Sequence, residues 1–328
     1  MLPRVSEINV VVPVYGCGSC LETLHERLVQ SLSRTGADWE IIYVDDCSPD
    51  ESWNRLAGFA ASDPRVRAFH MSRNFGQHAA ITAGLAQSRG EWTVVMDCDL
   101  QDPPEEIPRL YEIARKGHDL VLTTRLRRAQ NPFRKLAARV YFKARNFFFK
   151  TDIGSEYSTL SILSRKVVNA FLSVGDRDRQ YMLILHWLGF RPAVLEIQHS
   201  SREAGHSSYT LGTLVRVALD GMFFQTTVLL RWIVYTGFAV AVLGALAAAG
   251  IVYSYMVENP LPGWTSLSVL ILLIGGFIII STGISALYVG KIFDQVKGRP
   301  LYVIDRVARA DGESIVNEEA GTAQVSMS

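Results

Sequence analysis

The first 125 residues alternate between short apolar runs and stretches with helical spacing, and this alternation limits the folds open to the chain. The runs are expected to form strands at residues 8–13, 40–44, 66–71, 92–96 and 119–124. Helices are expected at residues 21–32, from the capping box at residues 48–51, and at residues 76–87 and 104–116. The first run is continuously apolar, which is typical of a strand buried on both faces. The alternation predicts an α/β fold with a doubly wound, mainly parallel sheet.

Acidic side chains follow two of these expected strands. Asp45 and Asp46 come at the end of the second, and Asp97 and Asp99 follow the fourth. Ligands bind at the carboxyl edge of an open α/β sheet. Two carboxylates one residue apart suit a hard divalent cation, Mg²⁺ or Mn²⁺, that holds a diphosphate. The alternative is a metal-free turn that leads into the acidic start of a helix at Glu105.

Several function classes are disfavoured by composition and by missing motifs. The formal net charge of +1 argues against a nucleic-acid partner, which requires a basic surface. No Gly-x-Gly-x-x-Gly string follows the first strand, which argues against a dinucleotide-binding fold. The first residues lead directly into a strand, so no signal peptide is expected.

The four cysteines are Cys17, Cys20, Cys47 and Cys98. Cys17 and Cys20 have the spacing of a redox or zinc motif. All four lie near expected strand ends, however, and ordinary thiols in a reducing compartment are the favoured interpretation. The sequence therefore predicts no disulfide framework.

Two segments, residues 233–256 and 267–289, contain no charged residue, and each is long enough to cross a bilayer core of about 30 Å. The link between them lacks Lys and Arg, whereas the outer flanks contain Arg231, Lys291 and Lys297. By the positive-inside rule, both chain ends are then cytoplasmic. The expected organisation is a cytoplasmic catalytic domain at residues 1–208, a juxtamembrane amphipathic helix at 209–227, a transmembrane hairpin at 228–290, and a cytoplasmic tail at 291–328 with a disordered end. This predicts a multi-pass protein of the bacterial inner membrane.

Residues 132–150 have an apolar stripe rich in Phe and a separate basic face. Lys135, Arg139 and Lys143 stand four residues apart on that face. Such a pattern is typical of a helix that lies in the membrane interface. An ordinary surface helix with a solvated basic face is the alternative.

Several strings in the same order give the chain a resemblance to a known family. They are Val11-Val12-Pro13-Val14-Tyr15, Tyr43-Val44-Asp45-Asp46-Cys47-Ser48-Pro49-Asp50, Arg73-Asn74-Phe75-Gly76, Asp97-Cys98-Asp99-Leu100-Gln101-Asp102-Pro103-Pro104-Glu105, and the segments 202–209 and 296–302. The chain resembles membrane-bound glycosyltransferases of family 2, in the polyprenyl-phosphate branch that includes dolichol-phosphate mannose synthase-like and bactoprenol glycosyltransferase-like enzymes. The resemblance extends over nearly the whole chain, to about residue 305.

The resemblance implies a GT-A nucleotide-sugar fold and a set of roles for individual residues. Nucleotide-sugar contacts are implied for Pro13, Tyr15, Val44, Asp45, Asp46, Asp97, Cys98 and Asp99. The metal, Mg²⁺ or Mn²⁺, would be held by Asp99 and Gln101, with Asp97 beside them. Arg125 and Arg202 match basic positions that contact phosphates, so the implied catalytic set is Asp97, Asp99, Arg125 and Arg202. The implied product is a polyprenyl-phosphate sugar, formed with inversion on the cytoplasmic face by a homo-oligomer.

The chain departs from the family pattern at five positions. Gly16 and Cys17 replace the usual Asn-Glu, Ser208 replaces a Lys, Thr159 stands where relatives place an acid, and Leu287 replaces a Glu. Asp152 and Glu156 are candidates for the missing carboxylate, with solvated loop acids as the alternative. The identity of nucleotide and sugar therefore does not transfer.

The chemistry of the acceptor makes these losses tolerable. A phosphate monoester has a second pKa of about 6 and is largely dianionic at neutral pH, so it needs no strong general base. It needs cations at the membrane surface, and the face formed by Lys135, Arg139 and Lys143 is expected to bind the lipid phosphate. Two other functions stay open: a membrane transferase that extends a glycan, and a non-catalytic scaffold that binds nucleotide sugars.

Overall fold

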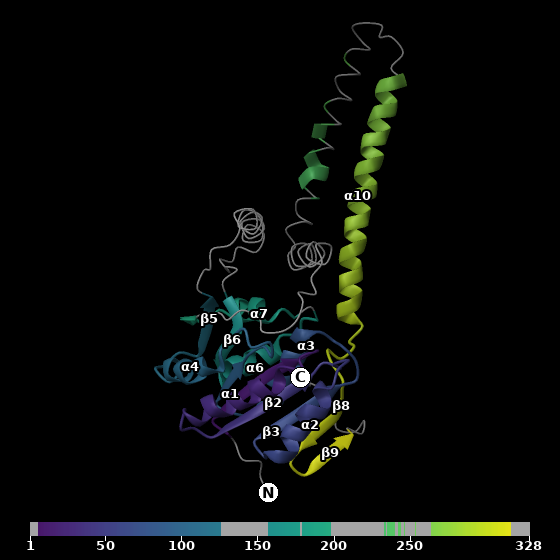
Figure 1. The fold of residues 1–328 in the computed structure, drawn as a ribbon. Helices are drawn as coiled ribbons and strands as arrows, with labels where there is room; N and C mark the ends of the chain where they lie inside the picture. The colour runs from purple at the N-terminus through teal and green to yellow at the C-terminus, as the bar shows by residue number, and fades with distance from the viewer. Residues whose placement is uncertain are drawn as a thin grey trace. The chain divides into compact units, whose positions relative to one another are not determined.

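The computed structural model describes residues 6–125, 157–177, 179–197 and 264–315, with helical positions at 233, 235–239, 242, 243, 246 and 253 (Figure 1). The chain divides into two compact units. One comprises Met1–Lys135, Asp152–His206 and Arg299–Ser328, and the other comprises Leu136–Thr151 and Ser207–Gly298. The predicted catalytic domain of residues 1–208 thus lacks the insertion 136–151 and gains residues from the C-terminal end.

The first unit is built on a nine-stranded sheet with the order β7-β5-β6-β4-β1-β2-β3-β8-β9. Its centre is parallel: β1 (Ile8–Val14) pairs with β2 (Trp39–Asp45) and β4 (Trp92–Val95), and β2 pairs with β3 (Val66–Met71). All seven residues of β1 are buried, as its continuous apolar run predicts. The parallel α/β sheet expected from the alternating pattern is therefore confirmed for this part of the chain.

Outside its centre the sheet is mixed. β6 (Tyr157–Ser164) runs antiparallel to both β4 and β5 (Leu120–Arg125), and β5 pairs in parallel with β7 (Ala193–Ile197). A strand that runs antiparallel to its neighbours, as β6 does between β4 and β5, can be joined to them without the crossover helix that a parallel strand requires.

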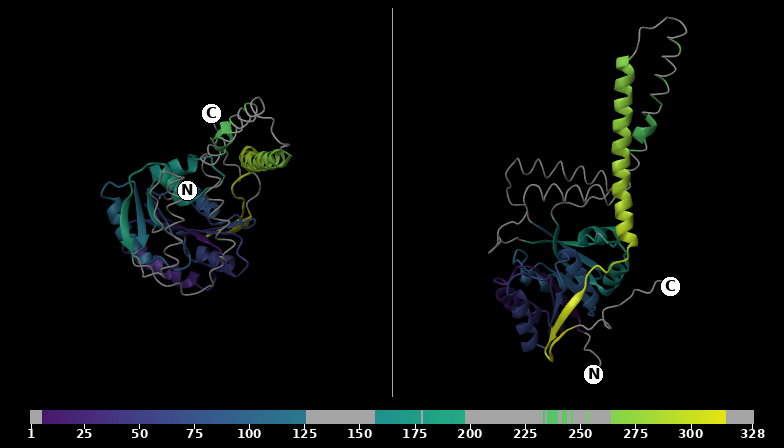
Figure 2. Two further views of the ribbon diagram at one scale, coloured as in Figure 1. Left: turned by 90° about the horizontal axis from the view of Figure 1, so that it is seen from above. Right: turned by 90° about the vertical axis from the view of Figure 1, so that its right-hand side faces the viewer.

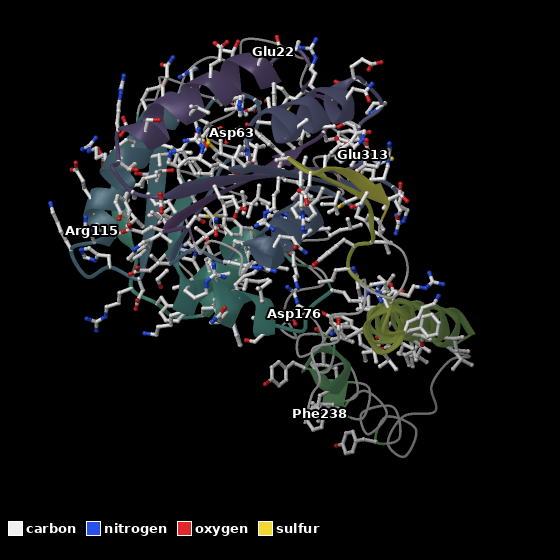
Figure 3. The ribbon with its side chains drawn as sticks, turned by 90° about the horizontal axis from the view of Figure 1, so that it is seen from below. Glu22, Asp63, Arg115, Asp176, Phe238 and Glu313 are labelled. Atoms are coloured by element: carbon white, nitrogen blue, oxygen red, sulfur yellow. A yellow bond between two sulfur atoms is a disulfide. The ribbon has the colours of Figure 1, made fainter. Side chains whose placement is uncertain are left out.

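Helices cover both faces of the sheet, as the view from below shows (Figure 3). One core forms between the sheet and α1 (Leu21–Ser33), α2 (Ser52–Ser62) and α4 (Ile107–Ala114), the last preceded by a short 3₁₀ helix, η1 (Pro104–Glu106). The opposite core forms against α3 (Gln77–Gln87), α6 (Arg165–Ser173) and α7 (Tyr181–Trp187). Val10 and Val12 face the first core and Val11 faces the second, because successive strand residues point to opposite faces.

The C-terminal residues complete the sheet. β8 (Ile304–Arg309) pairs antiparallel with β3, and β9 (Gly312–Ile315) pairs with β8. Figure 2 shows this hairpin in yellow at the edge of the sheet. The prediction of a tail with a disordered end is wrong for the residues of β9, because β8 pairs with the edge of β3 and its own free edge offers backbone partners to the polar segment that follows. Residues 316–328 lie outside the described part of the chain.

Among the described residues, one helix is long and apolar enough to cross a membrane. This is α10 (Trp264–Val296), within which Ile274–Val296 meets the length and hydropathy requirement. It covers most of the second predicted span, residues 267–289. The first predicted span, residues 233–256, is helical at its described positions but otherwise lies outside them, so the two-helix hairpin is not confirmed.

Candidate functional site

Two loops at the carboxyl edge of the sheet form the walls of the candidate site. Residues 15–20 follow β1, and residues 97–101 follow β4. The strand order places β2 and β3 on one side of β1 and β4 on the other, so the winding reverses between β1 and β4. Ligands of open α/β sheets bind at such a switch point.

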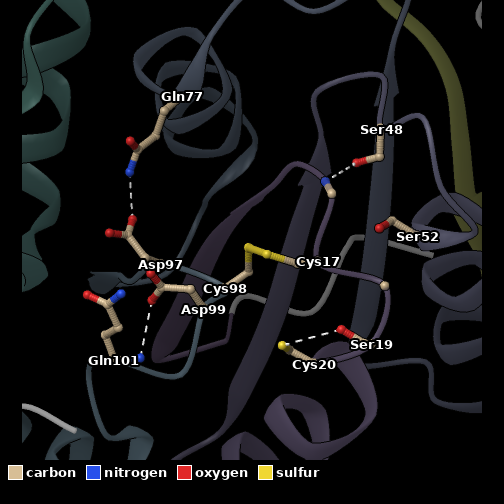
Figure 4. The surroundings of a disulfide bond; sticks show 12 residues. Cys17, Ser19, Cys20, Ser48, Ser52, Gln77, Asp97, Cys98, Asp99 and Gln101 are labelled. Atoms are coloured by element: carbon tan, nitrogen blue, oxygen red, sulfur yellow. Dashed lines mark hydrogen bonds between the residues drawn. A yellow bond between two sulfur atoms is a disulfide. The ribbon is translucent and has the colours of Figure 1, made fainter. Parts of the chain in front are cut away.

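The loop after β4 brings together three side chains with oxygen atoms: Asp97, Asp99 and Gln101 (Figure 4). Gln77, the first residue of α3, donates a hydrogen bond from Nε2 to Asp97 Oδ1 at 2.7 Å. The backbone N–H of Gln101 donates to Asp99 Oδ1 at 3.2 Å. Leu100 adopts a φ of 60°, in the left-handed region, which turns the loop tightly between them.

These side chains fit a hard divalent cation. Carboxylate and amide oxygens are the donors that Mg²⁺ and Mn²⁺ prefer. In the described part of the chain, no group of three or more His, Cys, Asp or Glu residues could hold a metal. Asp97 and Asp99 would then supply two carboxylates at most, and oxygen atoms from outside the protein would supply the remaining contacts, as is usual for Mg²⁺.

The third acid of the loop has a different task. Asp102 is 2% exposed, and its carboxylate accepts a hydrogen bond from the hydroxyl of Ser158 on β6. This contact ties the loop after β4 to the neighbouring strand. Thr159, at the position where relatives place an acid, is the next residue of β6 and is half-buried.

Cys98, between the two acids, forms a disulfide with Cys17 in the loop after β1. Cys20 and Cys47 are free thiols. The prediction that the cysteines form no disulfide is therefore wrong, and the redox spacing of Cys17 and Cys20 pointed to the wrong partner. The physical reason is the fold: β1 and β4 are adjacent strands, and their ends bring together two cysteines separated by 81 residues.

Asp45 is fully buried at the end of β2, where three groups of His70 and Ser48 hold its carboxylate by hydrogen bonds. His70 Nδ1 on β3 lies 2.6 Å from Asp45 Oδ2. The hydroxyl of Ser48 also bonds to Asp45, and the Ser48 N–H donates at 3.3 Å. The ring of Trp53 packs against His70 with ring centroids 5.0 Å apart. Asp45 is thus fixed by side chains from β3 and from the loop after β2.

The Asp46 carboxylate organises the loop between β3 and α3. It accepts hydrogen bonds from the N–H groups of Phe75 at 2.7 Å and Gly76 at 2.8 Å. Burial raises the pKa of Asp46, and these two N–H groups oppose that rise. Gly76 has a φ of +96°, a conformation that side chains disfavour, so glycine suits this bend. Asp46 therefore shapes a wall of the site through the motif that contains Arg73.

The other residues implied for the nucleotide pocket have different surroundings. Tyr15 is 52% exposed at the end of β1 and is available to a ligand. Pro13 is buried in β1, and the side chain of Val44 packs in the core beneath α3. Val44 can therefore meet a nucleotide only through its backbone.

The basic residues of the predicted site lie at or beyond the edge of the described structure. Arg125 is the last residue of β5, which ends at the same edge of the sheet as β7. Arg202, Lys135, Arg139 and Lys143, as well as Asp152, Glu156 and Ser208, lie outside the described residues.

Sequence reasoning missed three residues that hold the acids of the site: Gln77, His70 and Ser48. Gln77 follows a recognised motif and starts a helix, which could have drawn attention to it. His70 ends a strand beside the one that carries Asp45, and only the parallel register shows that the two residues pair.

Comparison with known proteins agrees with this geometry. The family model for glycosyl transferase family 2 matches residues 9–172. The protein belongs to glycosyltransferase family 2. The resemblance found in the motifs is thereby confirmed, and the sheet is GT-A-like.

Relatives of this family member match nearly its full length. The undecaprenyl-phosphate 4-deoxy-4-formamido-L-arabinose transferase of Pectobacterium atrosepticum is 33% identical over 319 residues, which is 94% of this chain and 96% of the relative. An uncharacterized glycosyltransferase of Bacillus subtilis, YkcC, is 29% identical over 307 residues, 93% of this chain and 95% of the relative. Among solved structures, glucosyl-3-phosphoglycerate synthase from Mycobacterium tuberculosis, in complex with Mn²⁺, UDP-glucose and phosphoglyceric acid, gives a TM-score of 0.47 at 17% identity and covers 66% of this chain and 77% of its own.

Proposed function

We propose that this family 2 glycosyltransferase moves a hexose-type sugar from a nucleotide donor to polyprenyl phosphate, of the undecaprenyl type, at the cytoplasmic face of the membrane. The observation that carries the proposal is the grouping of Asp97, Asp99 and Gln101 at the switch point of the sheet. The full-length similarity to relatives named as undecaprenyl-phosphate transferases supports the choice of acceptor.

The donor half of the reaction needs charge stabilisation. As the bond from the anomeric carbon to the diphosphate breaks, negative charge grows on the leaving nucleoside diphosphate. A bound Mg²⁺ or Mn²⁺ would neutralise part of that charge, and Asp99 and Gln101, with Asp97 beside them, would hold it. Arg125 and Arg202 are proposed to bind the phosphates, since a guanidinium can meet two phosphate oxygens at once. Tyr15 and the fixed Asp45 are proposed to bind the nucleoside.

The acceptor half needs no carboxylate base. A phosphate oxygen of the lipid is already ionised, and its lone pair forms the new bond to the anomeric carbon as the diphosphate leaves from the opposite side. The reaction therefore inverts the anomeric centre. Thr159, in place of an acid, is compatible with this chemistry.

The membrane arrangement is also proposed. The apolar helix α10 supports one span, and the uncharged segment 233–256 supports a second that would make the protein multi-pass. Both chain ends would then be cytoplasmic, as the flanking Lys and Arg residues indicate. We further propose that the enzyme acts as a homo-oligomer.

The test is product formation by the purified full-length protein. The protein, under dithiothreitol, would be incubated with undecaprenyl phosphate, a panel of nucleotide sugars and either Mn²⁺ or Mg²⁺, and lipids would be examined by mass spectrometry. A lipid with one added sugar for one donor is the expected result. Product on glycan acceptors alone would instead indicate a glycan-extending enzyme, and nucleotide-sugar binding without turnover would indicate a scaffold.

A further inference from the structure

We propose that the Cys17–Cys98 disulfide is a reversible redox latch across the donor site, which weakens metal and donor binding when formed and restores it when reduced. This inference rests on the proposed function, because it concerns the regulation of the same site. The proposed transfer reaction gives no role to Cys17, and Cys98 is implied only as a contact of the nucleotide sugar.

The first support is the position of the bridge. Cys17 follows β1 and Cys98 follows β4, the two strands between which the winding of the sheet reverses. The disulfide therefore spans the crevice in which an open α/β sheet binds its ligand. The Cα atoms are 6.5 Å apart, within the range that a disulfide allows without backbone movement.

The second support is that the bridge joins two loops with different hydrogen-bond anchors. In the loop after β1, Gly16 donates its N–H to Ser48 Oγ at 3.1 Å, and Gly18 donates its N–H to Asp50 Oδ2 at 2.9 Å. These bonds tie it to the loop after β2. With the disulfide, the loops after β4, β1 and β2 are all linked to one another. We therefore expect that an entering donor cannot move these loops apart.

The third support is the position of Cys98 between the two acids. Asp97 accepts a hydrogen bond from Gln77, and Asp99 accepts one from the backbone of Gln101. A metal ion that binds these carboxylates must compete with those bonds and turn the side chains. A covalent link at the residue between them restricts the backbone rotation that this turning requires (Figure 4).

The redox chemistry is that of a thiol pair. Hydrogen peroxide oxidises one thiol to a sulfenic acid and is reduced to water; the second thiol attacks that sulfur, forms the S–S bond and releases another water. A dithiol reverses the reaction by supplying two electrons and two protons, and itself becomes a disulfide. Cys17 is half-buried whereas Cys98 is 7% exposed, so the sulfur of Cys17 is the one that an incoming thiol reaches. Disulfides that form in a reducing compartment are usually transient and redox-sensing, which fits the proposed cytoplasmic site.

The first experiment compares Mn²⁺ binding to full-length protein after treatment with hydrogen peroxide or with dithiothreitol. Free Mn²⁺ would be measured by electron paramagnetic resonance, and the state of each cysteine by mass spectrometry of peptides. The oxidised protein should bind Mn²⁺ about ten- to a hundredfold more weakly, the range typical for losing the groups that orient metal ligands. Cys17→Ser should bind as the reduced protein does under both treatments. Cys47→Ser, which keeps the bridge, should respond as the unchanged protein does.

The midpoint potential of the cysteine pair is a second measurement, and it requires no turnover because it is linked thermodynamically to Mn²⁺ binding. If oxidation weakens Mn²⁺ binding tenfold, saturating Mn²⁺ must favour the dithiol tenfold, which raises the midpoint potential of the pair by about 30 mV. Equal Mn²⁺ affinity in both redox states, no shift in midpoint, or no peptide linking Cys17 to Cys98 after peroxide would each overturn the latch. Absence of lipid-linked sugar from reduced protein would instead overturn the proposed function, and it would leave the Mn²⁺ and midpoint measurements unaffected.

Discussion

At the scale of single residues, the site depends on side chains that other side chains hold in place. Asp99 accepts a hydrogen bond from the backbone N–H of Gln101, and Asp97 accepts one from the side chain of Gln77. Asp45 is hydrogen-bonded to the ring of His70. Each of these three acids is thus held in a defined orientation by a neighbouring donor. A ligand that binds Asp97 or Asp99 has to exchange these hydrogen bonds for its own contacts.

The metal assignment predicts that Asp99→Ala abolishes most turnover. Loss of one metal carboxylate should lower kcat by about 10²–10³-fold, the effect typical of removing one electrostatic contact to a developing charge. Turnover with Mn²⁺ would be measured across a range of metal concentrations. The matched control is Glu112→Ala, an exposed acid on α4, which should leave turnover unchanged. Full activity of Asp99→Ala would exclude Asp99 as a metal ligand.

The contact between His70 and Asp45 predicts a change in donor affinity. His70→Ala removes a hydrogen bond to a buried carboxylate, an interaction of about 1.5–3 kcal/mol, so the KM for the donor should rise about ten- to a hundredfold while kcat changes little. His70→Asn can place an amide N–H near the position of Nδ1 and should restore much of the affinity. If, in both variants, kcat falls by as large a factor as the KM rises, His70 is only a structural residue.

At the scale of elements, helix α3 packs unusually close to the central strand. A Cβ built on Gly84 would lie 2.2 Å from Cγ1 of Val11. Gly84→Ala should therefore destabilise the fold by about 1–3 kcal/mol through overpacking. Gly58→Ala on α2 has no atom within 4 Å of its new methyl group and should stabilise by about 0.4–1 kcal/mol. Chemical denaturation of both variants checks the pair, and equal stabilities would contradict the close contact.

The β8–β9 hairpin predicts that the C-terminal end is required for folding. A chain that ends after Val303 would expose the edge of β3 and remove Val307 and Ala308 from the core, where they are 7% and 1% exposed. It would also remove Glu313, which accepts a hydrogen bond from Trp53 Nε1 at 3.1 Å. The shortened protein should aggregate or melt at a lower temperature, since open strand edges pair with other chains. A chain that ends after Ile315 is the control, and equal melting of the two would contradict the role of the hairpin.

The strands that sequence patterns located are those with continuous apolar runs, whichever strand they pair with. The run at residues 92–96 became β4, and the run at residues 66–71 became β3. The missed strands have long-range partners: β8 pairs with β3 across more than 230 residues, and its polar alternation resembles a tail. The acids of the site could be identified because they follow strands directly. Local sequence pattern does not encode which strands become neighbours. It therefore could not identify the hydrogen-bond partners of these acids, His70 and Gln77, or the disulfide to Cys17.

At the scale of the whole molecule, one unit is interrupted twice by the other. The chain leaves the sheet unit at Leu136 and returns at Asp152, then leaves at Ser207 and returns at Arg299. The second excursion contains α10, and the sheet is completed only after it. The sheet is therefore completed only by residues that follow the excursion containing α10, so the chain must be made through both excursions before the sheet unit can fold completely.

The basic face predicted from the sequence of residues 132–150 indicates where the lipid phosphate binds. Changing Lys135, Arg139 and Lys143 together to Gln should raise the KM for undecaprenyl phosphate, since each cation near an anionic surface contributes about 1 kcal/mol. The KM for the nucleotide sugar should not change, because these residues are not proposed to contact the donor. The matched control removes three positive charges from α4 and the turn after it, at Arg109, Arg115 and Lys116. Equal acceptor KM values for the two triple variants would show that net charge, and not this face, recruits the lipid; a raised KM for the first alone would assign it the acceptor phosphate.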